Sequence, residues 1–305
     1  MIPASLARDV SPDRAAWTDR KGSAEPKEGI DTVRKTPDTD DYAHKLALSD
    51  VLREPAIRAA IQALELPPGS RGLDAGCGIG SHTLLLAEAV APGGHVIGLD
   101  LRPDFLARAR ETAAKSPLSE RVSFQEGNVN SLPFDDDGYD WLWRVDCAGY
   151  APGEPLPMLR ELARVVRPGG VVAVLGWSSQ QLLPGHPLLE ARLNATSLGI
   201  APFGKGRRPE LHFLRALGWF RDAGLEEPRA GTFVGDVHAP MSDGVRTALL
   251  SLIQMRWGEP RSELSEEDWA EFRRICQPES PDFILNLPDY YAFFTYSLFF
   301  GKVAR

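Results

Sequence analysis

The stretch that decides the fold is LDAGCGIG, residues 73–80. It opens in a short strand pattern over 72–74, and a helix pattern over 81–90 follows it directly. Glycine permits a positive φ angle and lets a ligand approach the backbone closely. A helix that begins there points its unpaired N–H groups toward the same ligand. The stretch therefore predicts a strand, a tight turn and a helix, with a binding site at the carboxyl end of the strand.

The segments around this turn alternate between strand and helix patterns. An apolar run over 171–177 is typical of a strand buried on both faces. Pro103 and Pro168 fall where helices are expected to begin and end. The alternation favours a parallel sheet with helices on both faces. The expected strands are 72–74, 95–100, 122–125, 139–143 and 171–177, and the expected helices between them are 81–90, 103–115 and 156–166.

Both flanks of this region also have regular patterns. Apolar residues recur at helical spacing from Tyr42 to Leu64, where Pro55 predicts a break between two helices. Beyond Trp177, prolines and glycines interrupt the rhythm as far as residue 208. The patterns after that predict a helix over 210–223, a strand over 232–237, helices over 242–257 and 265–276, and a strand-like aromatic run over 293–300.

Composition excludes several classes of protein. The chain has 305 residues, of which 43% are hydrophobic, and its formal net charge is −8. No run of about 20 apolar residues is present to span a membrane, and no secretory signal pattern is present. The acidic balance argues against a nucleic acid partner. Cys77, Cys147 and Cys276 lie too far apart in sequence to form a disulfide framework or a zinc site, so we expect no metal and a cytoplasmic location.

The residues around the glycines select among ligands. Gly76 and Gly78 fit a dinucleotide fingerprint, but Ser81 stands where its third glycine belongs. Asp74, just before the turn, disfavours an anionic pyrophosphate and favours an ammonium group. Asp100 ends the second strand, where a carboxylate accepts hydrogen bonds from ribose hydroxyls. A ligand with a ribose, an amino group and no phosphate is S-adenosylmethionine.

Taken together, these motifs resemble those of the class I S-adenosylmethionine-dependent methyltransferases that act on small molecules. The resemblance covers 42–180 and the closing strands. It implies a Rossmann-like, doubly wound α/β fold with a mostly parallel seven-stranded sheet and helical lid insertions. The motifs that carry it, in order, are 73–80, 96–100, 127–129, 139–143 and 162–170.

Position within these motifs implies the cofactor contacts. Family members often have Asp where this chain has Asn128, whose amide can both accept and donate a hydrogen bond. The implied contacts are Gly76, Cys77 and Gly78 at the methionine and ribose, Asp100 at the ribose hydroxyls, Leu101, Asn128 and Val129 at adenine, Arg144 and Val145 at the methionine end, and Tyr42 as a lid contact.

The resemblance implies transfer of a methyl group to a small acceptor by in-line displacement, leaving S-adenosylhomocysteine. The apolar and aromatic content of the insertions suggests an apolar or aromatic acceptor. We expect a monomer or a homodimer. The expected division is a mobile extension or lid over 1–41, a cofactor-binding core over 42–180, a lid insertion over 181–208, a core continuation over 209–239, a helical substrate-side insertion over 240–290, and a closing strand over 291–305.

Two residues are candidate catalytic bases. Asp146 follows the fourth strand, although a capping or surface carboxylate is an equal interpretation. His238 follows a predicted strand beside an insertion, although a lone histidine is more often a satisfied surface or core residue. Two other functions stay open. One is a non-catalytic S-adenosylmethionine-binding protein, and the other, which Asp74 and Ser81 disfavour, is a nicotinamide-dependent oxidoreductase.

Overall fold

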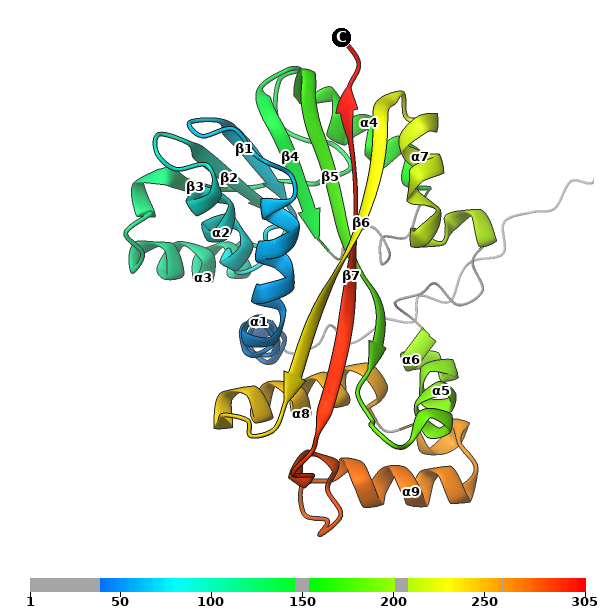
Figure 1. The fold of residues 1–305 in the computed structure, drawn as a ribbon. Coiled ribbons are helices and arrows are strands. Elements are labelled where there is room, and N and C mark those ends of the chain that lie inside the picture. Colours follow the sequence, from blue (N-terminus) through cyan, green and yellow to red (C-terminus); the bar gives the residue numbers. More distant parts are fainter. Residues whose placement is uncertain (1–38, 146–153, 201–207, 259) are drawn as a thin grey trace, which may run out of the picture. The chain divides into compact units, whose positions relative to one another are not determined.

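The glycine turn follows β1, the third strand of a seven-stranded sheet with the order β3-β2-β1-β4-β5-β7-β6 (Figure 1). The computed structural model describes residues 39–145, 154–200, 208–258 and 260–305. Strands β1 to β5 run parallel to one another, and β7 is antiparallel to both β5 and β6. The predicted mostly parallel seven-stranded sheet is confirmed. Its strands are β1 (Arg71–Ala75), β2 (His95–Asp100), β3 (Val122–Glu126), β4 (Tyr139–Val145), β5 (Val166–Gln181), β6 (Leu225–His238) and β7 (Tyr291–Val303).

Helices cover both faces of this sheet. Trp141 and Trp143 of β4 belong to a hydrophobic cluster with apolar residues of α1, α2, α5, α8 and α9. Leu142, which points to the other face because side chains alternate along a strand, clusters with α4 and α7. The helices are α1 (Thr39–Gln62), α2 (Ser81–Ala89), α3 (Pro103–Ala114), α4 (Pro155–Arg164), α5 (Pro187–Ala195), α6 (Ser197–Ile200), α7 (Ala216–Asp222), α8 (Asp243–Trp257) and α9 (Glu266–Cys276).

Strand β4 anchors the centre of the sheet. Its residues Trp141, Leu142 and Trp143 are each at most 1% exposed. The Trp141 ring occupies the space that a side chain at Gly72 of β1 would need, because a Cβ there would lie 2.1 Å from ring atoms. The indole Nε1 of Trp141 donates to the Ser70 hydroxyl at 2.8 Å, which satisfies its buried polar atom.

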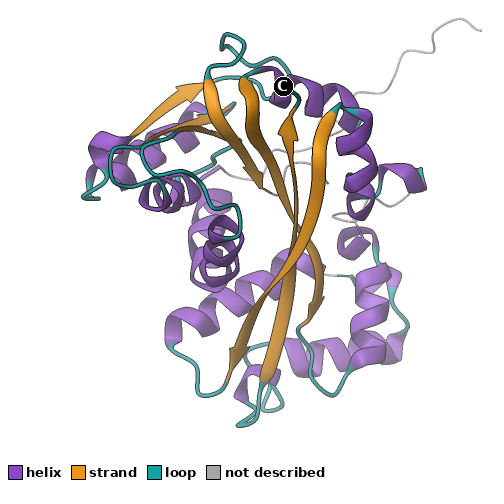
Figure 2. Ribbon diagram, turned by 45° about the horizontal axis from the view of Figure 1, so that its top comes forward, coloured by secondary structure: helices purple, strands orange, loops and turns teal. Residues whose placement is uncertain are grey.

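The three strands β5, β7 and β6 are much longer than the others. They contain 16, 13 and 14 residues, whereas β1, β2 and β3 contain 5, 6 and 5. Helices α8 and α9 lie beside the far ends of β6 and β7, away from β1–β3 (Figures 1 and 2). The long strands therefore carry the sheet past the edge at which β1 and β4 end.

Several predicted elements differ from the observed ones, and the strand predicted over 232–237, for example, begins at Leu225. Pro55 lies inside the continuous helix α1, because Ala56, Ile57 and Ala60 are fully buried and this packing offsets the lost hydrogen bond. The helix predicted over 210–223 begins only at Ala216, after two 3₁₀ turns. The strand predicted over 171–177 is longer and begins at Val166, which pairs with Tyr139, so the preceding helix ends at Arg164.

The connection from β3 to β4 has no helix. Residues 127–138 form a loop that includes an isolated bridge between Asn128 and Ser131. Within the described part of the chain, no helix has the length and apolar character needed to cross a membrane.

Candidate functional site

The glycine turn between β1 and α2 has a backbone conformation that would be strained for residues other than glycine. Gly76, Gly78 and Gly80 have φ angles of 88°, 55° and 84°, a region that side chains disfavour. At Gly80 space is also lacking, because a Cβ would lie 2.8 Å from the Cβ of Ala109. The backbone N–H groups of Gly76 and Cys77 both donate to the carbonyl of Leu99, at 2.7 and 2.9 Å. The turn is therefore held against the end of β2.

Asp100 is the side chain that joins the turn to the next helix. One oxygen of its carboxylate accepts from the backbone N–H of Gly78 at 2.9 Å, and the other accepts from the N–H of Arg102 at 3.0 Å. Arg102 is the N-cap residue of α3. The carboxylate thus fixes the turn and the start of α3 together, and it lines the pocket beside them.

The pocket has a volume of about 170 Å³. Of the residues that the sequence predicted as cofactor contacts, the structure brings five together in its wall: Gly76, Cys77, Gly78, Asp100 and Val145. The sequence analysis missed the others, which come from α1, from the turn, from the start of α2 and from α3. These further lining residues are Leu46, Asp50, Arg53, Ile79, Ser81, His82 and Phe105.

Asp74, just before the turn, does not line the pocket. It is 2% exposed, and its carboxylate accepts a hydrogen bond from the Thr83 hydroxyl at 2.7 Å. Burial raises the pKa of Asp74 to about 7, the Thr83 hydrogen bond works against this rise, and the nearby charge of Asp100 adds to it. Its predicted contact with an ammonium group stays a prediction.

The other predicted cofactor contacts lie outside the described pocket wall. Leu101, next to Asp100, is 63% exposed, and Arg144 is buried in β4 with 2% exposure. Val129 packs partly buried against the cluster on the α4 side. Tyr42 belongs to α1, but its side chain is outside the described part of the chain.

The structure describes only one of the two candidate bases. Asp146 lies outside the described residues. His238 ends β6, is exposed, and has its Nδ1 3.0 Å from the carbonyl oxygen of its neighbour Ala239. The structure brings His82 to the pocket instead, and burial, followed by the charge of Arg53, lowers the pKa of His82 to about 4. His82 is therefore neutral at pH 7.

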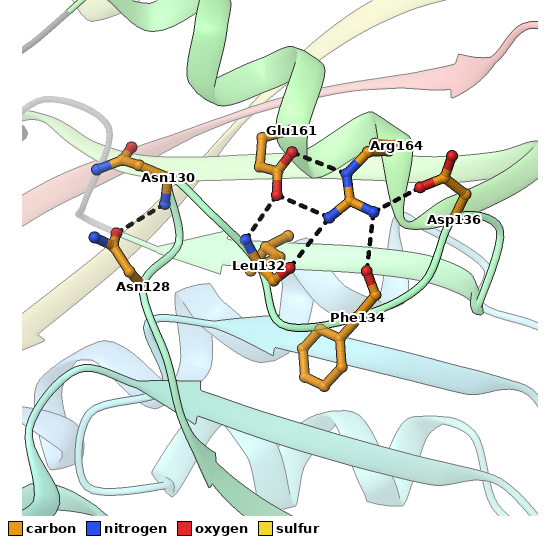
Figure 3. Close-up of polar contacts among 7 residues, drawn as sticks. All are labelled: Asn128, Asn130, Leu132, Phe134, Asp136, Glu161 and Arg164. Carbon is orange, nitrogen blue, oxygen red and sulfur yellow. Dashed lines mark hydrogen bonds and ion pairs between the residues drawn. The ribbon is translucent and has the colours of Figure 1, made fainter.

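Side chains of α4 hold the loop that carries Asn128 (Figure 3). Arg164 donates to the carbonyls of Leu132 and Phe134 at 3.1 and 2.9 Å. Glu161 accepts from the backbone N–H of Leu132 at 2.6 Å and pairs with Arg164. Hydrogen bonds to Glu161 and Asp136 raise the pKa of Arg164, so the guanidinium stays charged. The loop conformation thus depends on a helix that follows it in the sequence.

Asn128 itself, which is exposed, forms a local turn. Its side-chain oxygen accepts from the backbone N–H of Asn130 at 2.9 Å, and its backbone oxygen accepts from the N–H of Ser131 at 3.0 Å. The amide nitrogen, a donor, is the part of this side chain that the turn does not use.

Comparison with known proteins gives matches to methyltransferases. Residues 73–170 match a family model described as a methyltransferase domain. The chain is 35% identical over 156 residues to an uncharacterized 37.1 kDa protein in transposon TN4556 of Streptomyces fradiae, covering 50% of this chain and 43% of that protein. It is 34% identical over 126 residues to a demethylmenaquinone methyltransferase of Bacillus cytotoxicus, covering 41% of this chain and 52% of that enzyme. The chain thus spans about half the length of these curated relatives.

Solved structures share the fold. The crystal structure of the YcgJ protein from Bacillus subtilis superposes with a TM-score of 0.52 and 20% sequence identity, covering 82% of this chain and 98% of that one. The matched family, the seven-stranded sheet and the position of the glycine turn agree with one another. Residues 73–170 are therefore similar to a methyltransferase domain, and the chain shares its fold with the matched solved structure.

Proposed function

We propose that this protein transfers the methyl group of S-adenosylmethionine to a small-molecule acceptor and releases S-adenosylhomocysteine. The observation that carries the proposal is the pocket in which the Asp100 carboxylate meets the turn from Gly76 to Gly78. The family match over the same residues supports it. The similarity to the demethylmenaquinone methyltransferase also supports the proposal.

The hydrogen bonds of the turn favour this cofactor over a dinucleotide. A pyrophosphate site needs backbone N–H groups that point at the ligand. Here the N–H groups of Gly76 and Cys77 donate to Leu99, and that of Gly78 donates to Asp100. The Asp100 carboxylate has further acceptor positions, which suit two ribose hydroxyls. These contacts argue against the nicotinamide-dependent alternative.

The residues of the chain would mainly align the reactants. When bound, the cofactor supplies an electrophilic methyl group on a sulfonium. Asp100 would hold the ribose, and the turn would hold the chain that leads to the sulfur. Val145, at the end of β4, lines the same pocket and would face the acceptor side. Fixing two reactants about 3 Å apart in line can supply much of the rate enhancement. Asp146 and His238 are the proposed bases for an acceptor that must lose a proton.

The acceptor is proposed to be apolar or aromatic. The long strands beyond β4 carry an aromatic cluster, in which the rings of the partly buried Trp177 and the buried Phe294 stack with centroids 4.8 Å apart and Tyr296 meets both edge-on. The demethylmenaquinone methyltransferase relative is named for a quinone acceptor of similar character. We propose that 181–208 and 240–290 form the lid and the acceptor side together with 1–41, of which residues 1–38 lie outside the described part of the chain.

Calorimetric titration with S-adenosylhomocysteine tests the proposal. We expect micromolar binding by the wild type and a loss of at least tenfold in Asp100→Asn, which keeps the side-chain shape. The matched control is Asp104→Asn, an exposed carboxylate on α3 that lies outside the pocket wall. Preference for NAD, or no binding by the folded protein at millimolar ligand, would remove the proposal.

A methylation assay separates an enzyme from a non-catalytic binder. Labelled S-adenosylmethionine and a panel of phenols, quinols and amines would be incubated with the protein. A labelled product that requires Asp100 supports methyl transfer. Cofactor binding without product across the panel would favour the non-catalytic alternative.

A further inference from the structure

Asn128, in the loop after β3, lies beside the strand end that carries Asp100. Strand β3 pairs in parallel with β2 as far as Glu126, which is opposite Asp100. The backbone N–H of Gly127 then donates to the backbone oxygen of Asp100 at 3.0 Å. Gly127 also packs closely against β2, because a Cβ there would lie 2.7 Å from Cδ1 of Leu99. Asn128 therefore follows directly on the edge at which the Asp100 carboxylate lines the pocket.

The order of the strands indicates which part of the cofactor would face this loop. Strand β2 lies between β1 and β3. With the ribose at Asp100, the amino-acid chain would extend over the turn on the β1 side, where Val145 of β4 also lines the pocket. The base would then leave the ribose in the opposite direction, toward β3. Asn128 is on that side, and Phe105 of α3, the helix between β2 and β3, lines the pocket as well.

The side chain of Asn128 has its oxygen engaged within the loop. Its Oδ1 accepts from the backbone N–H of Asn130 at 2.9 Å. Because an N–H group must face an acceptor, this contact also fixes which end of the amide is the oxygen. The nitrogen is on the side away from Asn130 (Figure 3). Within the described part of the chain, no acceptor is bonded to that nitrogen.

We propose that Asn128 donates a hydrogen bond to N1 of the cofactor's base, and so selects adenine over a base that carries a proton at N1. The inference rests on the proposed function. An amide nitrogen is a donor only. N1 of adenine is an unprotonated ring nitrogen and accepts a hydrogen bond, whereas N1 of hypoxanthine carries a hydrogen and donates one. Two donors that face each other in a binding site leave both unsatisfied, which costs affinity.

An aspartate at this position would have the opposite preference. A carboxylate accepts through both oxygens, so it could keep the bond from the Asn130 N–H and present its second oxygen to the base. That oxygen would repel the lone pair of adenine N1 and would accept the N1–H of hypoxanthine. Asn128→Asp therefore reverses the polarity of one atom and leaves the loop contact in place.

The experiment measures two ligands by calorimetry, S-adenosylhomocysteine and S-inosylhomocysteine, which differ only in having adenine or hypoxanthine as the base. We expect the wild type to bind the adenine ligand roughly ten- to a hundredfold more tightly. In Asn128→Asp the adenine ligand should bind at least about tenfold more weakly and the hypoxanthine ligand at least about tenfold more tightly than in the wild type. The control is Asn130→Asp, which adds the same charge at an exposed side chain of the same loop. It should keep the wild-type preference.

The outcomes separate this inference from the proposed function. If Asn128→Asp binds S-adenosylhomocysteine as tightly as the wild type does, the side chain is not a donor to N1 and the inference is wrong. Equal weakening of both ligands, or the same reversal in Asn130→Asp, would mean that the charge or the loop conformation is responsible, and would also overturn it. So would a wild type that binds the two ligands equally. If the folded wild type binds neither ligand, the proposed function itself fails, independently of the variants.

Discussion

The two halves of the sheet are built from strands of different length. In the turn half, residues 71–126, the strands are 5 or 6 residues long and end at one edge, where the glycine turn and Asp100 follow directly. In the long-strand half, residues 166–303, the strands have 13 to 16 residues and continue past that edge. The short strands bring site residues to a shared edge of the sheet, whereas the long strands extend the sheet beyond that edge.

The halves also differ in what supports them. The turn half is held by backbone contacts to neighbouring strands and by Asp100. The long-strand half also depends on buried polar contacts made by side chains. Glu190 of α5, for example, is 1% exposed and accepts the N–H groups of Leu182 and Leu183, and Tyr290 donates to the carbonyl of Leu182 at 3.0 Å. We therefore expect cofactor affinity to depend on the turn half and stability to depend on both.

The largest effect is expected for Gly72→Ala in the turn half. A Cβ there would lie 2.1 Å from the Trp141 ring, which is buried and cannot move aside, so we expect the free energy of unfolding to fall by about 3 kcal/mol. Urea denaturation measures it. The control is Gly231→Ala in the long-strand half, whose Cβ would meet Phe233 at 3.4 Å. A fall of under about 1 kcal/mol in Gly72→Ala would contradict tight packing at the centre of the sheet.

A pH-dependent effect is expected for Asp74→Asn. The folded pKa of Asp74, about 7, is raised from 3.8, so the native state holds this proton more tightly than the unfolded state, and wild-type stability falls as pH rises from about 4 to 7. The amide lacks this dependence. We expect the free energy of unfolding of Asp74→Asn to exceed that of the wild type by about 2 kcal/mol at pH 8. This difference should close toward pH 4.

Denaturation at several pH values would measure this difference. Asp222→Asn, at an exposed carboxylate of α7, is the control and should follow the wild-type curve. A constant offset between Asp74→Asn and wild type at every pH would show that burial does not perturb Asp74.

A smaller effect, confined to stability, is expected for Glu190→Gln in the long-strand half. The amide keeps one accepting oxygen, but its nitrogen is a donor and would face the Leu182 N–H in place of an accepting oxygen, so we expect a loss of about 1–2 kcal/mol in the free energy of unfolding. The affinity for S-adenosylhomocysteine should stay the same, as in the exposed control Glu267→Gln. A tenfold loss of affinity would mean that the two halves are energetically coupled.

The smallest effect is expected for Arg164→Gln. Removing the guanidinium releases the carbonyls of Leu132 and Phe134 in the loop after β3, so a cofactor contact at Asn128 should weaken (Figure 3). We expect roughly three- to tenfold weaker binding of S-adenosylhomocysteine. Arg160→Gln, an exposed position on the same helix, is the control. Unchanged affinity would place the adenine contact elsewhere.

The turn half could be predicted closely from the sequence. The strand over 95–100 has the predicted bounds, and β1, β3 and α3 differ from the predicted bounds by one residue at one or both ends. A turn with positive φ angles needs glycines, and the site needs an acid at the end of a strand. Both can be recognised within a short stretch of sequence. The same signals found Gly76, Gly78 and Asp100 in the pocket wall.

The contribution of α1 could not be predicted. Helical spacing indicated the helix, but the side of the sheet on which it packs depends on contacts with β6 and α8, which lie far along the chain. Asp50 and Arg53 were therefore not recognised as pocket residues. No sequence motif marks His82 either. It reaches the pocket wall because the start of α2 packs against α1.

The amino-acid sequence by itself determined the alternation of strands and helices, the turn at 73–80 and the carboxylate at the end of β2, because periodicity and backbone conformation are properties of neighbouring residues. Only the tertiary structure decided that β7 lies between β5 and β6, that α1 brings Arg53 to the pocket, and that Arg164 holds the loop after β3. These features depend on contacts between distant segments, whose packing no local pattern specifies.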